Sequence, residues 1–92
     1  MKTLTKMEIQ LCDKIVSRAM NMGFYKDNKL TAFLDVQNAA KYWDMRLEEW
    51  LNADDLNFAH DIVGIYKNIV RKTPIKFINC FVPRFANERS DE

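Results

Sequence analysis

Hydrophobic residues recur at intervals of three and four in three stretches of the chain, which predicts three amphipathic helices. At the start of the first stretch, Thr5 and Glu8 have the spacing of a capping box. Gly23 follows the end of this stretch, at the position where a left-handed residue commonly closes a helix. These signals predict a helix over residues 6–22. Its apolar stripe consists of Leu11, Cys12, Ile15, Val16, Ala19 and Met20.

A second apolar stripe begins at about Ala32 and continues to Leu51. The pattern fits one long helix over residues 32–51, and it equally fits two helices with a bend around residues 44–48. The adjacent small residues Ala39 and Ala40 should let another helix approach closely. The stripe is formed by Phe33, Val36, Ala39, Ala40, Trp43 and Leu47, and Trp50 and Leu51 continue it.

The third helix is expected to begin after Asn52–Asp55, a break that ends in an N-cap signal, and to end near Lys72. Its apolar face holds Phe58, Ile62, Ile65, Tyr66 and Ile69. A glycine inside a helix costs about 1 kcal/mol relative to alanine. Gly64 therefore predicts a close contact with the backbone of a neighbouring helix.

Beyond this helix, Thr73–Pro74 ends it or starts another, and residues 75–82 fit either a short helix or an extended segment. Residues 87–92 have the composition of a flexible polar tail. We therefore predict an all-α fold, a small bundle of three main helices with a short aromatic C-terminal arm that is extended or a single helical turn. Residues 1–86 would form one domain, with a core built from Ile15, Ala19, Trp43, Phe58, Ile62 and Ile65.

Composition supports this prediction. A chain of 92 residues is the size of one domain. It holds only two glycines and two prolines, whereas average usage is about 7% and 5%. Few chain reversals are therefore encoded, which suits a few helices better than many short strands.

Charge is unevenly distributed along the chain, although the net charge is only +1. Residues 31–61 contain seven Asp/Glu and two Lys/Arg, whereas each flanking third contains six Lys/Arg and three Asp/Glu. The acidic middle is either a solvated helix face or a patch that meets a basic partner. The strong basic excess of a non-specific nucleic-acid binder is missing, so nucleic acid is not the expected partner.

Metal and cofactor sites are not predicted. Cys12 and Cys80 lie far apart, and with a single histidine they cannot form an ordinary four-ligand zinc site. The carboxylate pairs at residues 48–49 and 54–55 lack the alternating oxygen ligands of a calcium loop. The two glycines stand apart, so no phosphate-binding loop is encoded. The sequence has no apolar run of roughly 20 residues, so we expect no membrane span. Because it also has no hydrophobic leader, we expect the protein to be in the reducing cytosol, with both thiols buried.

His60-Asp61 is the pair that most resembles catalytic machinery. Adjacent helical residues point about 100° apart, so Asp61 is not expected to orient the His60 ring. No serine or cysteine lies one turn away to act as a nucleophile. We therefore expect a structural histidine and no enzyme activity.

DNA binding through a helix-turn-helix is also not expected. The N-terminal end of the third helix would act as the recognition helix, and its residues Asp54 and Asp55 would repel phosphates. The arm offers a different chemistry: Phe81 and Phe85 flank Arg84, and exposed aromatic residues beside an arginine are typical of interface hot spots. The alternative is that these rings cap the open end of the core.

The segment Asp54-Asp55-Leu56-Asn57-Phe58-Ala59-His60-Asp61-Ile62-Val63-Gly64-Ile65, followed by Phe81-Val82-Pro83-Arg84-Phe85, resembles a family of small phage and prophage proteins. Its members share the pattern DDFNFxHDxxGI … FxPRF and have no assigned biochemical activity. The resemblance covers about residues 43–86, and Pro74 stands where the family tends to have glycine. It implies a phage-encoded protein, a class that often acts by binding and blocking a host protein.

The leading hypothesis is therefore a non-enzymatic phage protein that acts in the host cytoplasm and inhibits or redirects a host factor. An anti-CRISPR or other anti-defence inhibitor fits this description. Two alternatives stay open, a nucleic-acid-associated accessory protein and an oligomeric sponge for a signalling nucleotide. A second copy of the chain, in a homodimer, is a further candidate partner. The expected partner-binding residues are Asp44, Glu48, Glu49, Asn57, His60, Asp61, Phe81, Arg84 and Phe85.

Overall fold

The computed structural model describes residues 3–70 and 81–87. Four α-helices and one π-helical turn follow one another in this part of the chain, and it contains no β-strand. The all-α prediction is thereby confirmed, with three main helices and one short one. The elements are α1 (Lys6–Asn21), α2 (Lys29–Trp43), α3 (Leu47–Leu51), α4 (Asp55–Ile65) and the π-helix η1 (Tyr66–Val70).

Helix α1 begins and ends as its sequence signals predict. Thr5 accepts a hydrogen bond from the backbone N–H of Glu8 (3.1 Å), and the Glu8 side chain accepts one from the N–H of Thr5 (2.9 Å). At the other end, Gly23 has a φ of 97°, and the N–H of Phe24 donates to the carbonyl of Ala19 (3.0 Å). This is the Schellman arrangement, in which glycine adopts the left-handed conformation without steric cost.

The apolar stripe over residues 32–51 is two helices rather than one. Helix α2 begins at Lys29, three residues before the expected Ala32, because the Asn28 side chain caps it by accepting from the N–H of Thr31 (3.3 Å). It ends at Trp43 because Asp44 adopts a left-handed conformation with a φ of 50°. The chain then turns at Asp44–Arg46 into α3.

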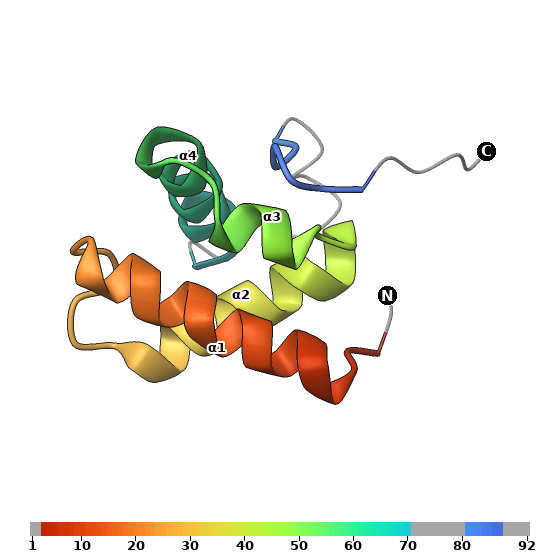
Figure 1. The fold of residues 1–92 in the computed structure, drawn as a ribbon. Helices are drawn as coiled ribbons and strands as arrows, with labels where there is room; N and C mark the ends of the chain where they lie inside the picture. The colour runs from red at the N-terminus through yellow and green to blue at the C-terminus, as the bar shows by residue number, and fades with distance from the viewer. Residues whose placement is uncertain (1–2, 71–80, 88–92) are drawn as a thin grey trace.

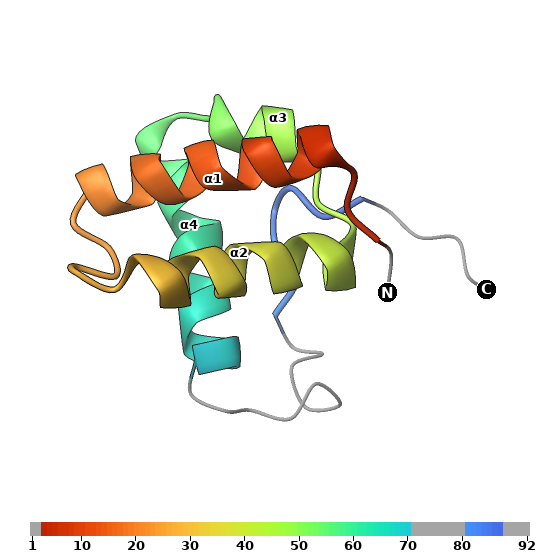
Figure 2. The same ribbon diagram turned by 90° about the horizontal axis from the view of Figure 1, so that it is seen from below.

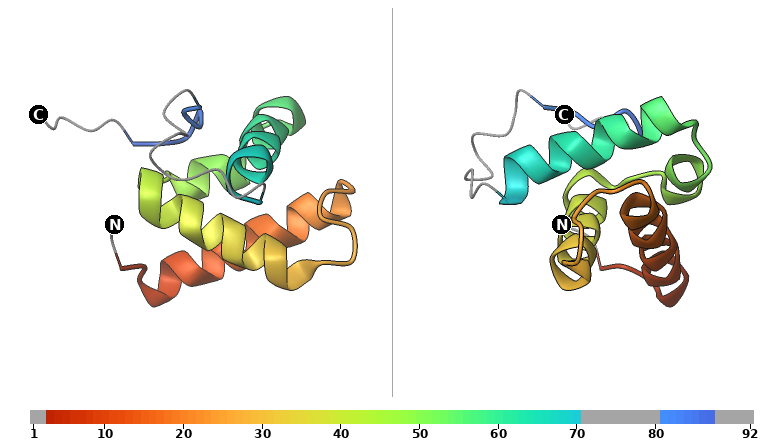
Figure 3. Two further views of the ribbon diagram at one scale, coloured as in Figure 1. Left: turned by 180° about the vertical axis from the view of Figure 1, so that it is seen from behind. Right: turned by 90° about the vertical axis from the view of Figure 1, so that its left-hand side faces the viewer.

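The helices form two layers. Helices α1 and α2 lie side by side in one layer, and α4 crosses them in the other (Figures 1 and 2). In the right-hand view of Figure 3, α1 and α2 are seen nearly end-on with α4 laid across them. The core between the layers includes the expected Ile15, Ala19, Phe58, Ile62 and Ile65. Trp43, expected in the core, is half-buried at its edge.

Helix α4 is capped by Asp54, whose side chain accepts from the N–H of Asn57 (2.8 Å). The helix is α-helical only to Ile65 and continues as the π-helix η1, so its expected end near Lys72 lies outside the described residues. Residues 81–87, which we call the arm, are not helical and lie beside α4 and α3 (Figures 1 and 3). Most of the segment predicted to be a short helix or extended, residues 75–80 with Cys80, lies outside the described part of the chain.

Candidate functional site

The arm is held in place by one buried carboxylate of α4. Asp61 is 0% exposed, and its two oxygens accept hydrogen bonds from the backbone N–H groups of Arg84 (2.8 Å) and Phe85 (3.1 Å). Hydrogen bonds to an ionised acceptor are roughly twice as strong as neutral ones. Asp61 therefore fixes the arm and is closed to direct contact with a partner.

His60 completes this site. Its Nδ1 lies 2.9 Å from a carboxylate oxygen of Asp61, so the expectation that Asp61 cannot orient the ring is wrong. Two adjacent helical side chains can converge when one is buried and the other folds back over it. An ionised carboxylate can only accept, so this contact is a hydrogen bond in the tautomer that carries its proton on Nδ1. No serine or cysteine among the described residues hydrogen-bonds to His60.

Gly64 makes room for the first residue of the arm. A Cβ atom at this position would overlap the ring of Phe81. The close contact predicted for this glycine is therefore real, but it is made with an aromatic side chain and not with a helix backbone. The Phe81 ring also contacts Trp43 edge-on, with the centroids 5.7 Å apart, and lies 6.0 Å from the His60 ring.

Arg46, a residue that the sequence analysis did not single out, joins the arm to α3. Its backbone N–H donates to the carbonyl of Phe85 (2.7 Å), and its guanidinium donates to the carbonyl of Arg84 (2.8 Å). The same guanidinium pairs with Glu49 (2.7 Å) and lies 5.6 Å from the centre of the Phe85 ring. Arg46 is the only lysine or arginine between Asp44 and Asp61, and this isolated positive charge in an acidic segment could have identified it from the sequence.

Two of the expected partner-binding residues have local structural roles. The backbone carbonyl of Asp44 accepts from the N–H of Asn87 (3.2 Å), and its carboxylate accepts from the Asn87 side chain (3.2 Å). Asp44 thus stops α2 and ties down the end of the arm. Asn57 donates from its side chain to Asp54 (3.1 Å) and belongs to the cap of α4.

Five of the other expected residues lie in the arm or in the helices beside it, namely Glu48, Glu49, His60, Arg84 and Phe85, whereas Asp61 is buried and Phe81 is half-buried against Gly64. Glu48 and Glu49 are exposed on α3, and Arg46 connects Glu49 to the backbone of Arg84 in the arm. A shallow depression of about 520 Å³ lies over this part of α3. We call this surface the arm face, and it consists of Arg46, Glu48, Glu49, His60, Val82, Arg84 and Phe85.

Helix α4 and the arm form one structural unit in this chain. Asp61 of α4 binds the backbone of Arg84 and Phe85, and Gly64 of α4 leaves the space that the Phe81 ring occupies. A change at either residue of α4 would therefore disturb the position of the arm.

Elsewhere, two titratable groups are buried within the layers. The hydroxyl of Tyr25 donates to the Asp35 carboxylate (2.9 Å), and desolvation raises the pKa of Asp35 above its usual range despite this bond. Desolvation, reinforced by Glu8, raises the pKa of the Cys12 thiol to about 11. Cys12 is thus the small buried hydrophobe that the sequence predicts.

Within residues 3–70 and 81–87, no three His, Cys, Asp or Glu side chains are grouped so that they could hold a metal ion. No helix in that part of the chain is sufficiently long and apolar to cross a bilayer.

Residues 7–87 match the model of a family of unknown function, DUF6874, and the chain belongs to this family. The match includes all the residues that build the arm face and the Asp61 site. No curated protein and no solved structure matches the chain.

Proposed function

We propose that this member of DUF6874 is a phage-encoded, non-enzymatic protein that binds a host factor through the arm face and inhibits or redirects it. The observation that supports this proposal is the position of Arg46. It bonds to Glu49 on one side and to the backbone of Arg84 on the other. Arg46 thus links Glu49 of the acidic patch to the aromatic arm, the two separate candidates in the sequence.

The chemistry of this surface favours a protein partner. Val82 is 65% exposed, and Arg84 is exposed next to the half-buried ring of Phe85. Arginine and aromatic residues are enriched among interface hot spots, and isolated carboxylates at the rim raise the rate of association with a basic surface. The complementary partner would offer basic side chains to Glu48 and Glu49 and an apolar recess to the arm.

The anchoring of the arm also favours binding. Ordering a flexible segment on association costs about 0.5–1.5 kcal/mol for each immobilised side chain. The arm is already fixed through its backbone by Asp61 and Arg46. The backbone that carries its exposed side chains is thus ordered before a partner binds, and the cost of ordering this backbone would not arise on binding.

The resemblance to phage proteins supplies the biological setting of the proposal. A small binding protein made in an infected cell would act in the host cytoplasm. The target class we favour is a CRISPR complex or another host defence complex, so that this protein would be an anti-CRISPR or other anti-defence inhibitor. Blocking a basic, nucleic-acid-binding surface of such a complex would require an acidic face such as the one on α3.

The test is an affinity capture of the tagged full-length protein from a bacterial lysate, with and without nuclease, followed by mass spectrometry. A host protein retained at stoichiometric levels should be lost when Glu48→Lys is introduced and when Arg84→Ala is introduced. The matched control is Asp13→Lys, which makes the same charge change at an exposed position of α1.

Loss of capture with the arm-face variants alone supports the proposal. Equal capture by wild type, Glu48→Lys and Arg84→Ala would place the contact elsewhere and refute the arm face as the binding surface. Capture that disappears on nuclease treatment would favour a nucleic-acid-associated accessory protein instead.

A further inference from the structure

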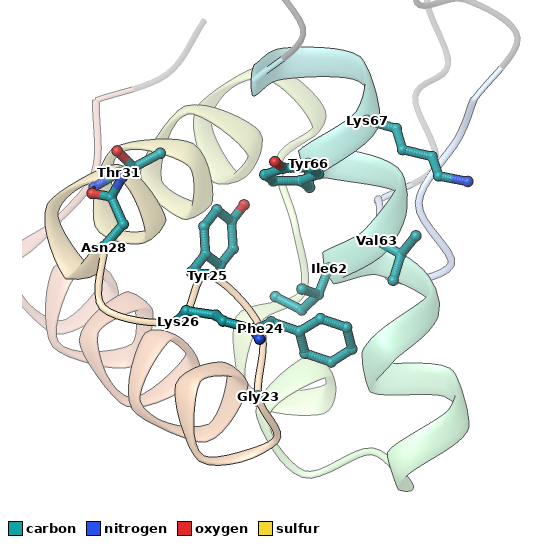
Figure 4. Close-up of a pocket in the computed structure, with 10 residues that line it drawn as sticks. All are labelled: Gly23, Phe24, Tyr25, Lys26, Asn28, Thr31, Ile62, Val63, Tyr66 and Lys67. Carbon is teal, nitrogen blue, oxygen red and sulfur yellow. The ribbon is translucent and has the colours of Figure 1, made fainter.

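A pocket of about 450 Å³ lies between the loop that follows α1 and the end of α4 (Figure 4). Its volume is within the range of about 300–1,000 Å³ that is typical of small-molecule sites. None of the described residues that line it belongs to the arm face. They are Gly23, Phe24, Tyr25, Lys26, Asn28, Thr31, Ile62, Val63, Tyr66 and Lys67.

The pocket has flat, apolar walls. The rings of Tyr25 and Tyr66 meet edge to face with centroids 5.6 Å apart, and Phe24 lies on the side of Ile62 and Val63 (Figure 4). The hydrogen bond from the Tyr25 hydroxyl to buried Asp35 fixes one of these rings. Such walls suit a ligand with a planar aromatic body.

The electrostatic lining of the pocket is positive. Lys26 and Lys67 are the charged residues among its described lining residues, and Figure 4 shows the Lys26 side chain running beside Phe24 while that of Lys67 points away from the cavity. The N-terminus of α2 lies at the same site through Asn28 and Thr31, and its first turn holds no acidic residue. A helix N-terminus carries roughly half a positive charge.

Carboxylates are present nearby, but they do not line the pocket. Asp35 is buried and paired with Tyr25, and Asp27 is exposed on the loop. The groups that a ligand would meet are therefore aromatic rings, the polar side chains of Asn28 and Thr31, and the ammonium group of Lys26. This combination selects an anion over a cation.

Two backbone irregularities from distant parts of the chain meet at this pocket. Tyr25 and Lys26 are consecutive non-glycine residues with positive φ, 62° and 36°. The opposite wall includes Tyr66 and Lys67, which belong to the π-helix η1. Left-handed non-glycine residues and π-helical turns both cluster at ligand-binding sites, because a regular helix or loop would not place the side chains there.

We propose that this pocket binds a small planar aromatic anion of mononucleotide size. The aromatic ring would pack against Phe24, Tyr25 and Tyr66, and the anionic group would be bound by Lys26, whose side chain runs beside Phe24 (Figure 4). A nucleoside monophosphate and an aromatic carboxylate share this chemistry. The proposal is independent of partner binding through the arm face.

The experiment is a titration of the isotope-labelled full-length protein, followed by backbone amide NMR. The probes are AMP, GMP and UMP, indole-3-acetate as the aromatic carboxylate, inorganic phosphate, and benzyltrimethylammonium as an aromatic cation. Binding at the pocket should give saturable shifts at residues 23–31 and 62–67. Affinity for either type of aromatic anion identifies which source of the shared chemistry the pocket accepts.

Lys26→Gln should weaken the binding of the aromatic anion about tenfold, the loss expected for one charge-assisted hydrogen bond. Val63→Glu, which adds a carboxylate to a partly exposed wall residue, should abolish binding. Lys14→Gln, the same charge change on the exposed face of α1, is the matched control and should have no effect.

Three outcomes would overturn the proposal. The first is the absence of saturable shifts with every aromatic anion. The second is equal or tighter binding of the aromatic cation, because it would show that the lysines do not select the ligand. The third is unchanged affinity in both Lys26→Gln and Val63→Glu. None of these results would bear on capture of a host protein by the arm face, so the two proposals can fail separately.

Discussion

Replacing Asp61 by asparagine should detach the arm while changing only one atom of the side chain. The wild-type carboxylate accepts from three donors, the N–H groups of Arg84 and Phe85 and Nδ1 of His60. Asparagine has one oxygen and an NH₂ group that can only donate. At least one of the three donors must then face another donor in a site that excludes water.

The magnitude follows from these contacts. Loss of one hydrogen bond to a charged group costs about 1.5–3 kcal/mol, and a buried unsatisfied donor costs about 1–3 kcal/mol, so the two overlapping terms predict a loss of about 2–4 kcal/mol. A domain of this size has a free energy of unfolding of about 5–15 kcal/mol. The substitution should therefore remove a large share of the stability and still leave a folded protein.

The assay is urea unfolding followed by tryptophan fluorescence, combined with hydrogen exchange at the amides of Arg84 and Phe85. Both amides should be protected in the wild type and should exchange rapidly in Asp61→Asn. Asp54→Asn is the matched control: Asp54 caps α4 through its side chain, and asparagine caps as well as aspartate, so a change below about 0.5 kcal/mol is expected. If Asp61→Asn loses no more than this control and keeps both amides protected, the reasoning about the buried carboxylate is wrong.

Three further predictions follow from single contacts. Gly64→Ala should lower the free energy of unfolding by about 1–3 kcal/mol because the new Cβ would overlap the Phe81 ring. In a Phe81→Ala background the same change should be neutral or stabilising, and a double-mutant cycle in urea measures this difference. Asp35→Asn should gain stability relative to the wild type as the pH rises through the window above 3.8. Burial raises the pKa of Asp35 above 3.8, so the folded wild type binds more protons than the unfolded wild type and loses stability as the pH rises through this window. Asparagine does not titrate, so the variant does not lose this stability. Urea unfolding at several pH values tests the difference. Arg84→Ala should change the free energy of unfolding by less than about 0.5 kcal/mol, since the contacts that the described residues make with exposed Arg84 go to its backbone. A larger loss in urea would give its side chain a structural role.

The local parts of the fold could be predicted from the sequence because their signals lie within a few residues. The Thr5–Glu8 capping box, the Gly23 helix end and the Asp54 cap depend on neighbouring residues alone. The break in the second stripe could not be located, because Asp44 ends α2 by adopting a left-handed conformation that aspartate tolerates without requiring.

The site depends on contacts across the chain, and this is why periodicity did not reveal it. Gly64 indicated a close contact, but its partner lies 17 residues later, in a segment whose conformation was ambiguous. Asp61 was judged from its angle to His60, whereas its main partners are two backbone amides of the arm. An amide donor is present at almost every residue, so no side-chain pattern distinguishes the two that a buried carboxylate will bind.

The way in which the arm is held separates folding from recognition. Asp61 and Arg46 bind the backbone N–H and carbonyl groups of Arg84 and Phe85, and they do not depend on the chemistry of the Arg84 side chain. Val82 and Arg84 are exposed and can change without loss of the anchor, whereas Phe81 is constrained by the space above Gly64. Members of the family could thus vary the two exposed positions to fit different partners while keeping the same fold. If the arm face binds a partner, exchanging residues 82 and 84 between family members should transfer the choice of partner and leave the midpoint of urea unfolding unchanged. An exchange that shifts this midpoint without changing the choice of partner would show that the arm serves the fold alone.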